Sequence, residues 1–234
     1  MVNFLIFIDN IAPFTKNDID KGTTPPDIYK ICVTIRETFL ISYDIRKENA
    51  LYFYIEYNHI LIKFLGNELR FLGPDQRSQA LLLNKALNKI NQIQVGEKKN
   101  EWVKSTPGIY AKRLKSNKAF IHFLVSKNFG WYIFIFDRVS PLTFPFLYHT
   151  FEYPKIKKFN QLEDLKSLFY ILPFNSSSNE RLIELLKLFT HMHSAKLDQL
   201  ILTSLHKITT LPDKILYMNF QIDQQEDNGK SEIN

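Results

Sequence analysis

The amino-acid sequence predicts an α/β protein built on a mainly parallel sheet with helices on both faces. Short apolar runs of β type alternate with segments of helical periodicity, which is the order typical of parallel sheets. The chain has 234 residues, of which 45% are hydrophobic, so it can bury one large core. We therefore expect a main domain over residues 1–194, a partly helical extension over 195–220, and a polar, disordered segment over 221–234.

The first half of the chain contains clear element signals. The expected elements are, in order, a strand over 2–8, a polar loop over 15–26, a helix over 28–40, a strand pair over 51–57 and 60–65 with a short hairpin extension at 68–72, and a helix over 78–93. Asp27 and Asp75 stand where helix N-caps belong, ahead of apolar residues at three- and four-residue spacing. Cys32 falls on the apolar face of its helix, so we interpret it as a core residue.

The second half gives a similar alternation. The expected elements are a turn at 105–110 entering a short strand, a helix over 117–126, strands over 131–137 and 146–150, a helix over 162–169, a strand end at 170–172, a helix over 179–193 and a helical continuation over 197–208.

Positive charge is concentrated in one segment. The whole chain has a net charge of +6, and residues 98–118 alone hold seven Lys or Arg against Glu101. Such a segment suits a polyanionic partner, although a solvated basic face is the alternative interpretation. Trp102 and Tyr110 within it add the aromatic faces on which RNA bases can stack.

Other function classes are excluded or disfavoured by composition. A single cysteine allows no internal disulfide and fits a reducing, cytoplasmic compartment. The apolar runs are too short for a signal peptide or a membrane span, so we expect a soluble protein. His191 and His193 are two residues apart on a predicted helix and point in different directions, so we expect no metal site. The sequence lacks the common nucleotide, hydrolase and zinc-protease motifs.

Four polar segments form a recognisable series, although each alone is compatible with capping and turn chemistry. They are TKNDIDKG at 15–22, SYDIRKE at 42–48, FLGNELRFLGPDQRSQALLLNKAL at 64–87 and STPGIYAKR at 105–113. In order and spacing the series resembles the archaeal tRNA pseudouridine-54 N1-methyltransferases of the SPOUT superfamily. The resemblance covers roughly residues 1–115.

The resemblance implies a Rossmann-like fold with a C-terminal trefoil knot, usually as a homodimer, that binds S-adenosylmethionine and methylates N1 of a pseudouridine in the tRNA T-loop. By motif, Asp75 would be the acidic residue nearest the substrate base. The implied RNA-binding residues are Asn17 and Asp18 beside the target nucleotide, the basic neighbours Arg46, Lys47 and Arg77, and Lys112 and Arg113 in the basic segment. A carboxylate can accept the imide proton, and arginine binds phosphate through paired hydrogen bonds.

The cofactor segments depart from the family pattern. The family has glycine-bearing loops here, whereas this chain has FPFLYHTFEYP at 144–154 and YILPFNSSSNERLIELL at 170–186, with no glycine between Trp131 and Asn228. Glycine permits the positive φ and close approach that such a loop needs. The implied cofactor contacts are Leu147, Tyr148, Leu172 and Ser176.

Three interpretations therefore stay open. A different loop geometry holds the cofactor, or the chain is a catalytically inactive tRNA-binding relative, acting alone or as the structural subunit of a heterodimer with an active paralogue. The third is an unrelated basic α/β interaction protein.

Overall fold

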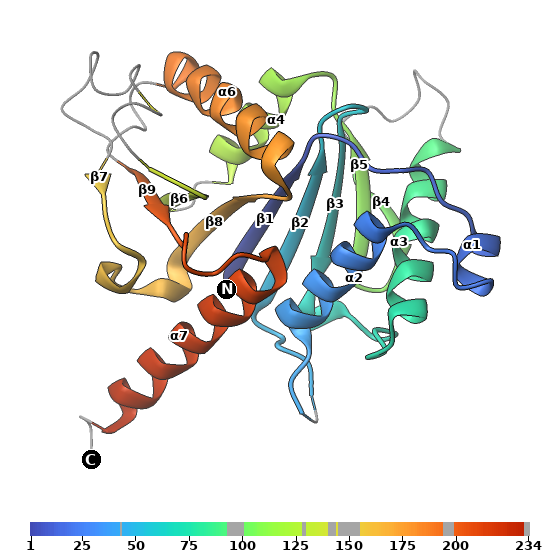
Figure 1. Ribbon diagram of the computed structural model, residues 1–234, viewed down its shortest axis with the longest axis horizontal. Coiled ribbons are helices and arrows are strands. Elements are labelled where there is room, and N and C mark those ends of the chain that lie inside the picture. The colour runs from blue at the N-terminus through green and yellow to red at the C-terminus, as the bar shows by residue number, and fades with distance from the viewer. Residues whose placement is uncertain are drawn as a thin grey trace.

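A computed structural model describes residues 1–42, 44–92, 101–127, 130–139, 144, 155–193 and 199–231. Its strands form one sheet in the order β4-β5-β3-β2-β1-β8-β6-β9-β7 (Figure 1). The strands are β1 (Val2–Ile8), β2 (Asn49–Ile55), β3 (Ile60–Leu65), β4 (Val103–Thr106), β5 (Ile109–Arg113), β6 (Trp131–Phe136), β7 (Lys155–Ile156), β8 (Leu168–Pro173) and β9 (Leu200–Ser204). The helices are α1 (Lys16–Asp20), α2 (Pro26–Phe39), α3 (Gln76–Asn91), α4 (Asn117–Ser126), α6 (Ser176–Met192) and α7 (Leu211–Ser231).

The sheet has a parallel part and an antiparallel part. Strand β1 pairs in parallel with β2 and β8, and β6 and β9 continue the parallel part to the short edge strand β7. Strands β3, β5 and β4 extend the other side of β2 by antiparallel pairing. We call the edge where β1, β2, β6, β8 and β9 end the carboxyl edge, and the opposite one the amino edge.

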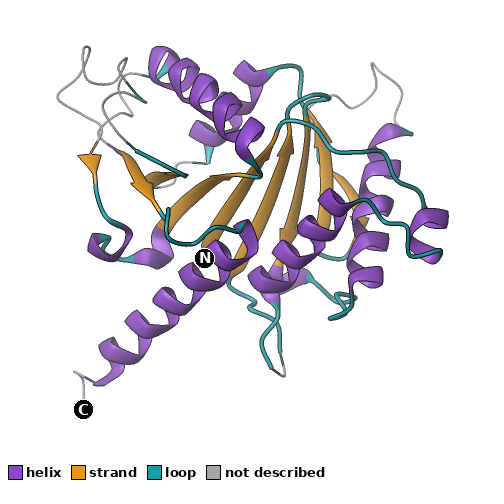
Figure 2. Cartoon of the chain, viewed as in Figure 1, coloured by secondary structure: helices purple, strands orange, loops and turns teal. Residues whose placement is uncertain are grey.

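Helices cover both faces of the sheet, which confirms the predicted fold class (Figure 2). One core lies between the sheet and α2, α3 and α7, and the other lies between the sheet and α4 and α6. Every residue of β1 is buried, and its side chains alternate between the two cores, with Phe4 in one and Leu5 in the other. A continuous apolar run is therefore required here, because both faces of the strand are covered.

Two predicted helices are wrong. Residues 162–169 form a short 3₁₀ turn (Leu165–Ser167) and the start of β8, and Asp164 before the turn has the left-handed φ of +47°. Residues 197–208 contain β9 instead, which pairs with β6 through Thr203 and Ile201. Both segments carry enough apolar residues for either state, and tertiary pairing selects the strand.

The C-terminal segment also differs from the prediction. Within the segment expected to be a partly helical extension, the described residues include β9, which lies between β6 and β7 in the sheet, and the start of α7. Helix α7 continues to Ser231 through most of the segment expected to be disordered. It packs on α2 and buries Leu211, Ile215, Met218 and Ile222 in the core that α2 shares with the sheet.

Smaller corrections concern the first half. The expected loop at 15–26 contains α1, and the expected hairpin extension at 68–72 follows a 3₁₀ turn (Gly66–Glu68) with no further strand. Pro25, not Asp27, occupies the N-cap position of α2. Asp75 caps α3 as predicted.

The strand expected at 146–150 lies outside the described residues. The C-terminal knot implied by the resemblance stays a prediction. Within the described ranges, no helix is both long and apolar enough to span a membrane.

Candidate functional site

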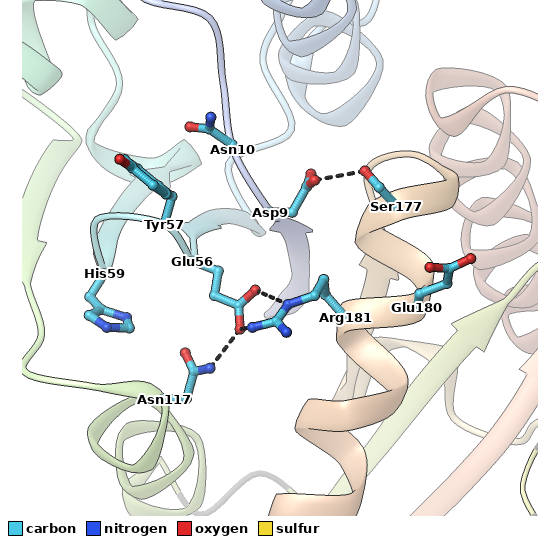
Figure 3. Close-up of a pocket in the computed structure, with 9 residues that line it drawn as sticks. All are labelled: Asp9, Asn10, Glu56, Tyr57, His59, Asn117, Ser177, Glu180 and Arg181. Atoms are coloured by element: carbon cyan, nitrogen blue, oxygen red, sulfur yellow. Dashed lines mark hydrogen bonds and ion pairs between the residues drawn. The ribbon is translucent and has the colours of Figure 1, made fainter.

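A polar cavity of about 510 Å³ opens at the carboxyl edge, where β1 and β2 end beside α4 and α6 (Figure 3). Its lining includes Asp9 after β1, Glu56 after β2, Asn117 on α4 and Arg181 on α6. The helix that follows β1 covers one face of the sheet and the helix that follows β8 covers the other. The cavity therefore lies at the switch point where open α/β sheets bind ligands.

Glu56 is the central charge of this cavity. It is only 7% exposed, and both of its oxygens accept hydrogen bonds from the Arg181 guanidinium at 2.8 Å. The amide of Asn117 donates a third bond at 2.6 Å. Hydrogen bonding to Glu56 raises the pKa of Arg181, so the guanidinium stays charged.

The same network orients a histidine. The Tyr54 hydroxyl donates to Oδ1 of Asn117 at 2.7 Å and lies 2.9 Å from Nδ1 of His59. Since the Tyr54 hydroxyl donates its proton to Asn117, Nδ1 of a neutral His59 must donate to the Tyr54 hydroxyl oxygen. Its Nε2 is then left as an acceptor on a ring that lines the cavity. Burial raises the pKa of Tyr54, which keeps the hydroxyl protonated.

Asp9 completes the polar wall. Its carboxylate accepts hydrogen bonds from the hydroxyls of Ser177 at 2.7 Å and Ser178 at 2.8 Å, in the first turn of α6. Burial alone would raise the pKa of Asp9, but the hydroxyl bonds together with the backbone N–H groups of Asp9 and Asn10 outweigh burial, and the pKa is lowered. The carboxylate is therefore charged at neutral pH.

A second, larger cavity of about 960 Å³ lies at the same edge, beside the ends of β6 and β9. Its lining residues are Asp137, Arg138, Val139, Ile156, Lys157, Lys158, Gln161, Ser204 and His206. Asp137 accepts a bond from Lys214 at 2.8 Å, and its backbone carbonyl accepts one from the Ser204 hydroxyl at 2.9 Å. Carboxylate, cationic and apolar groups thus line the same cavity.

The segments that carry the resemblance gather elsewhere, at the amino edge. A Cβ on Gly66 would lie 2.2 Å from the carbonyl oxygen of Arg46, so the segment 64–87 packs directly on the SYDIRKE segment. Gly108 has a φ of +79°, and a Cβ there would lie 2.6 Å from the backbone nitrogen of Leu69. Only glycine allows either approach.

The predicted basic residues of the SYDIRKE segment are already paired. Arg46 forms two hydrogen bonds with Asp223 of α7, at 2.6 and 2.7 Å, and is only partly exposed. Lys47 lies 3.4 Å from Asp44, and both side chains are exposed. In this structure Arg46 therefore joins α7 to the sheet instead of facing solvent.

An ion pair links α1 to the start of α3, where two of the predicted residues, Asp75 and Arg77, lie. Arg77 binds Asp20 of α1 at 2.7 Å, and Asp18 forms a capping box with Thr15. Asp75 accepts the backbone N–H of Ser78 at 2.8 Å. That bond lowers the pKa of Asp75, which is exposed and charged.

The remaining predicted residues are scattered. Lys112 and Arg113 point to opposite faces of β5: Lys112 lies near the ring of Trp102, and Arg113 donates to Asn91 at 2.9 Å. Leu172 is fully buried in β8, and Ser176 is exposed at the start of α6. Leu147 and Tyr148 lie outside the described residues.

Comparison with known proteins decides the family. The model of a family described as putative SAM-dependent RNA methyltransferases matches residues 12–130, just over half of the chain. The chain belongs to this family.

Several curated relatives are named tRNA (pseudouridine(54)-N(1))-methyltransferase. The one from Methanocaldococcus jannaschii is 35% identical over 106 residues, covering 43% of this chain and 51% of the relative. Those from Methanococcus vannielii and Haloferax volcanii are 33% identical over 109 residues and 34% identical over 101 residues, covering 44% and 43% of this chain and 49% and 48% of the relatives. The chain thus matches about half the length of these relatives.

The family match contains β2 to β5 and α1 to α4, whereas Asp137 and Arg181 lie beyond it. The matched Asp75 is also far from the larger cavity. Helix α3 packs on β4 and β5, and six strand spacings separate β5 from β9, roughly 29 Å at about 4.8 Å each.

The sequence interpretation missed Asp9, Glu56, Asn117, Arg181 and Asp137. A usable signal was present, because three of these residues follow directly after apolar strands whose carboxyl ends meet at one edge. Asn117 and Arg181 lie on helices and gave no comparable signal.

Within the described residues, no group of three or more His, Cys, Asp or Glu is placed to hold a metal ion.

Proposed function

We propose that this protein is an S-adenosylmethionine-dependent tRNA methyltransferase that acts on N1 of a pseudouridine in the T-loop. The observation that carries the proposal is the family match over 12–130, which contains all four motif segments. The activity for which the relatives are named supports the choice of substrate. A tRNA substrate would place the protein in the cytoplasm, as the sequence predicts.

The larger cavity supports the cofactor. Its volume of about 960 Å³ lies near the upper end of the 300–1,000 Å³ typical of small-molecule sites. The Asp137 carboxylate and the Ser204 hydroxyl suit ribose hydroxyls or an ammonium, Arg138 and Lys158 suit a carboxylate, and Val139 offers apolar contact. This donor set fits S-adenosylmethionine, which supplies the transferable methyl group when bound. The predicted contacts Leu147, Tyr148, Leu172 and Ser176 stay predictions.

Substrate recognition is assigned to the segments at α1 and the start of α3. Asp75, charged and exposed, would accept the N1 proton as the new N–CH₃ bond forms. Arg77, which is paired with Asp20 of α1, and Asn17 and Asp18 of the same helix would contact the RNA around the target nucleotide. Lys47, Lys112 and Arg113 would contact phosphates, and Arg46 would do so only after leaving Asp223.

A homodimer would reconcile these two locations. Six strand spacings, roughly 29 Å at about 4.8 Å each, separate β5, on which α3 packs, from β9 beside the larger cavity, so the Asp75 region and the cavity of one chain would not act on one nucleotide. In a dimer with two-fold symmetry, the Asp75 region of one subunit can face the cavity of the other.

The test is a methyl-transfer assay with two synthetic T-arm RNAs that differ only in pseudouridine or uridine at the target position. We expect N1-methylpseudouridine by mass spectrometry of the nucleosides from the first RNA and no methylation of the second. Calorimetric titration should show binding of S-adenosylmethionine. Absence of binding at millimolar cofactor would refute the enzymatic proposal, and RNA binding without cofactor binding would support an inactive tRNA-binding relative instead.

A further inference from the structure

Three lysines and three aromatic rings cluster on the α4 side of the antiparallel part of the sheet. Lys63 comes from β3, and its cross-strand partner Tyr110 comes from β5 with Lys112 two residues further on. Trp102 immediately precedes β4, and Phe123 and Lys127 come from α4 and its C-terminus. We call these six residues the lysine–aromatic surface.

Strand alternation puts the lysines on this face. In β3, Ile62 and Phe64 enter the core under α2 and α3, so Lys63 between them points to the opposite side. In β5, Ile109 and Ala111 do the same, which turns Tyr110 and Lys112 outward beside Lys63. The apolar positions of the strands therefore fix which face carries the charge.

Each lysine lies over an aromatic ring. The Lys63 ammonium is 4.5 Å from the ring centre of Trp102 and 4.6 Å from that of Tyr110. Lys112 is 5.7 Å from the Trp102 ring and 5.5 Å from Phe123, and Lys127 is 5.5 Å from Phe123. These are cation–π distances, so the rings hold the ammonium groups in place without neutralising them.

The positive charge of the surface is poorly compensated. Burial lowers the pKa of Lys63 and of Lys112, and the charge of Lys127 lowers both further. Glu68 is the carboxylate whose charge opposes this for Lys63, and it accepts a hydrogen bond from Tyr110. Across the described part of the chain, no ion pair within 4.0 Å involves any of the three lysines.

Charge decides what this surface can bind. A second copy presenting the same surface would bring two sets of three ammonium groups together, which like-charge repulsion opposes. A phosphodiester backbone neutralises such a set, and aromatic rings beside basic groups are how sheet surfaces hold nucleic-acid strands.

We propose that the lysine–aromatic surface binds the sugar–phosphate backbone of an RNA arm at a distance from the reacting nucleotide. The identity of this RNA as tRNA rests on the proposed function. Lys112 was expected to bind RNA from its charge run, whereas Lys63 and Lys127 belong to other elements and join it only in the fold.

The test measures affinity for an unmodified tRNA transcript, which contains no pseudouridine, by fluorescence anisotropy over a series of KCl concentrations. The test variant is the triple substitution Lys63→Gln, Lys112→Gln and Lys127→Gln. The matched control, Lys85→Gln, Lys89→Gln and Lys187→Gln, removes the same charge from exposed positions on α3 and α6.

We expect the test variant to bind at least about tenfold more weakly. The slope of the logarithm of the binding constant against the logarithm of the KCl concentration should become shallower by about two, since each phosphate contact contributes roughly 0.7–0.9 to that slope. The control should change affinity less than about twofold, and replacing the three lysines by arginine should keep binding close to that of the unsubstituted protein. Thermal unfolding curves that match the curve of the unsubstituted protein show that the variants are folded.

Equal losses in the test and control variants would overturn the proposal, as would unchanged binding by the test variant. Failure of the two proposals is distinguishable. If the unsubstituted protein binds the transcript but methylates no RNA, the lysine comparison still decides the surface. If the T-arm RNA is methylated but the transcript is not bound, the surface proposal alone is refuted.

Discussion

At the scale of single residues, Glu56 shows how a carboxylate can be held almost without water. Its oxygens are satisfied by Arg181 and Asn117, and Asn117 in turn fixes the roles of Tyr54 and His59. Removing one partner of such a network leaves a buried charge without its hydrogen bonds, which costs more than the bond itself contributes.

We therefore predict that Arg181→Leu lowers the free energy of unfolding by about 1–3 kcal/mol, measured by urea denaturation. The control Lys187→Leu lies on the same helix and removes an ion pair whose two side chains are both exposed, so its effect should stay below about 0.5 kcal/mol. The added Glu56→Gln change should recover part of the loss by removing the stranded charge. Equal effects of the two leucine variants would contradict the burial of Glu56.

At the scale of elements, α7 decides whether the C-terminal segment belongs to the fold. Its apolar residues recur at four- and three-residue spacing, and Ile215 and Met218 are fully buried. Adjacent residues on the same helix face solvent, including Leu216 at 49% exposure. Arg46 and Asp223 add an ion pair between α7 and the segment before β2.

Two neighbouring substitutions on α7 test this packing. Ile215→Ala should lower the free energy of unfolding by about 2–5 kcal/mol, because it removes a fully buried side chain and leaves a cavity. Leu216→Ala should cost less than about 0.5 kcal/mol, since that side chain is half exposed. Chemical denaturation measures the free energy of unfolding of the two variants. A similarly small effect of the two substitutions would mean that α7 does not pack on the core.

At the scale of the whole molecule, the two regions proposed for catalysis lie at different ends of one sheet. Asp75 is near the β4–β5 side and Asp137 is at the end of β6. If each active site combines Asp137 of one subunit with Asp75 of another, the two functions can be separated by mutation.

Subunit mixing tests this arrangement. Asp75→Asn and Asp137→Asn should each abolish methyl transfer, whereas subunit exchange between them should restore about a quarter of the activity of the unsubstituted protein, because half of the dimers are mixed and each carries one intact site. An inactive mixture would place both residues in the same chain. Exchange is verified by mixing differently tagged subunits.

The sequence by itself determined the fold class, most of the elements before residue 137 and the family. Largely apolar runs of β type such as 2–8, and helices such as α3 whose apolar spacing and N-cap agree, specify their secondary structure locally. The motif segments were equally visible, since close approaches such as that of Gly66 to Arg46 require glycine at fixed positions.

Only the tertiary structure decided β8, β9 and α7, whose apolar residues suit several states until neighbouring strands and helices select one. The same holds for the Glu56 network and the lysine–aromatic surface. Their members lie far apart in the sequence, and the side-chain chemistry of each depends on groups that strand order and helix packing bring within bonding distance.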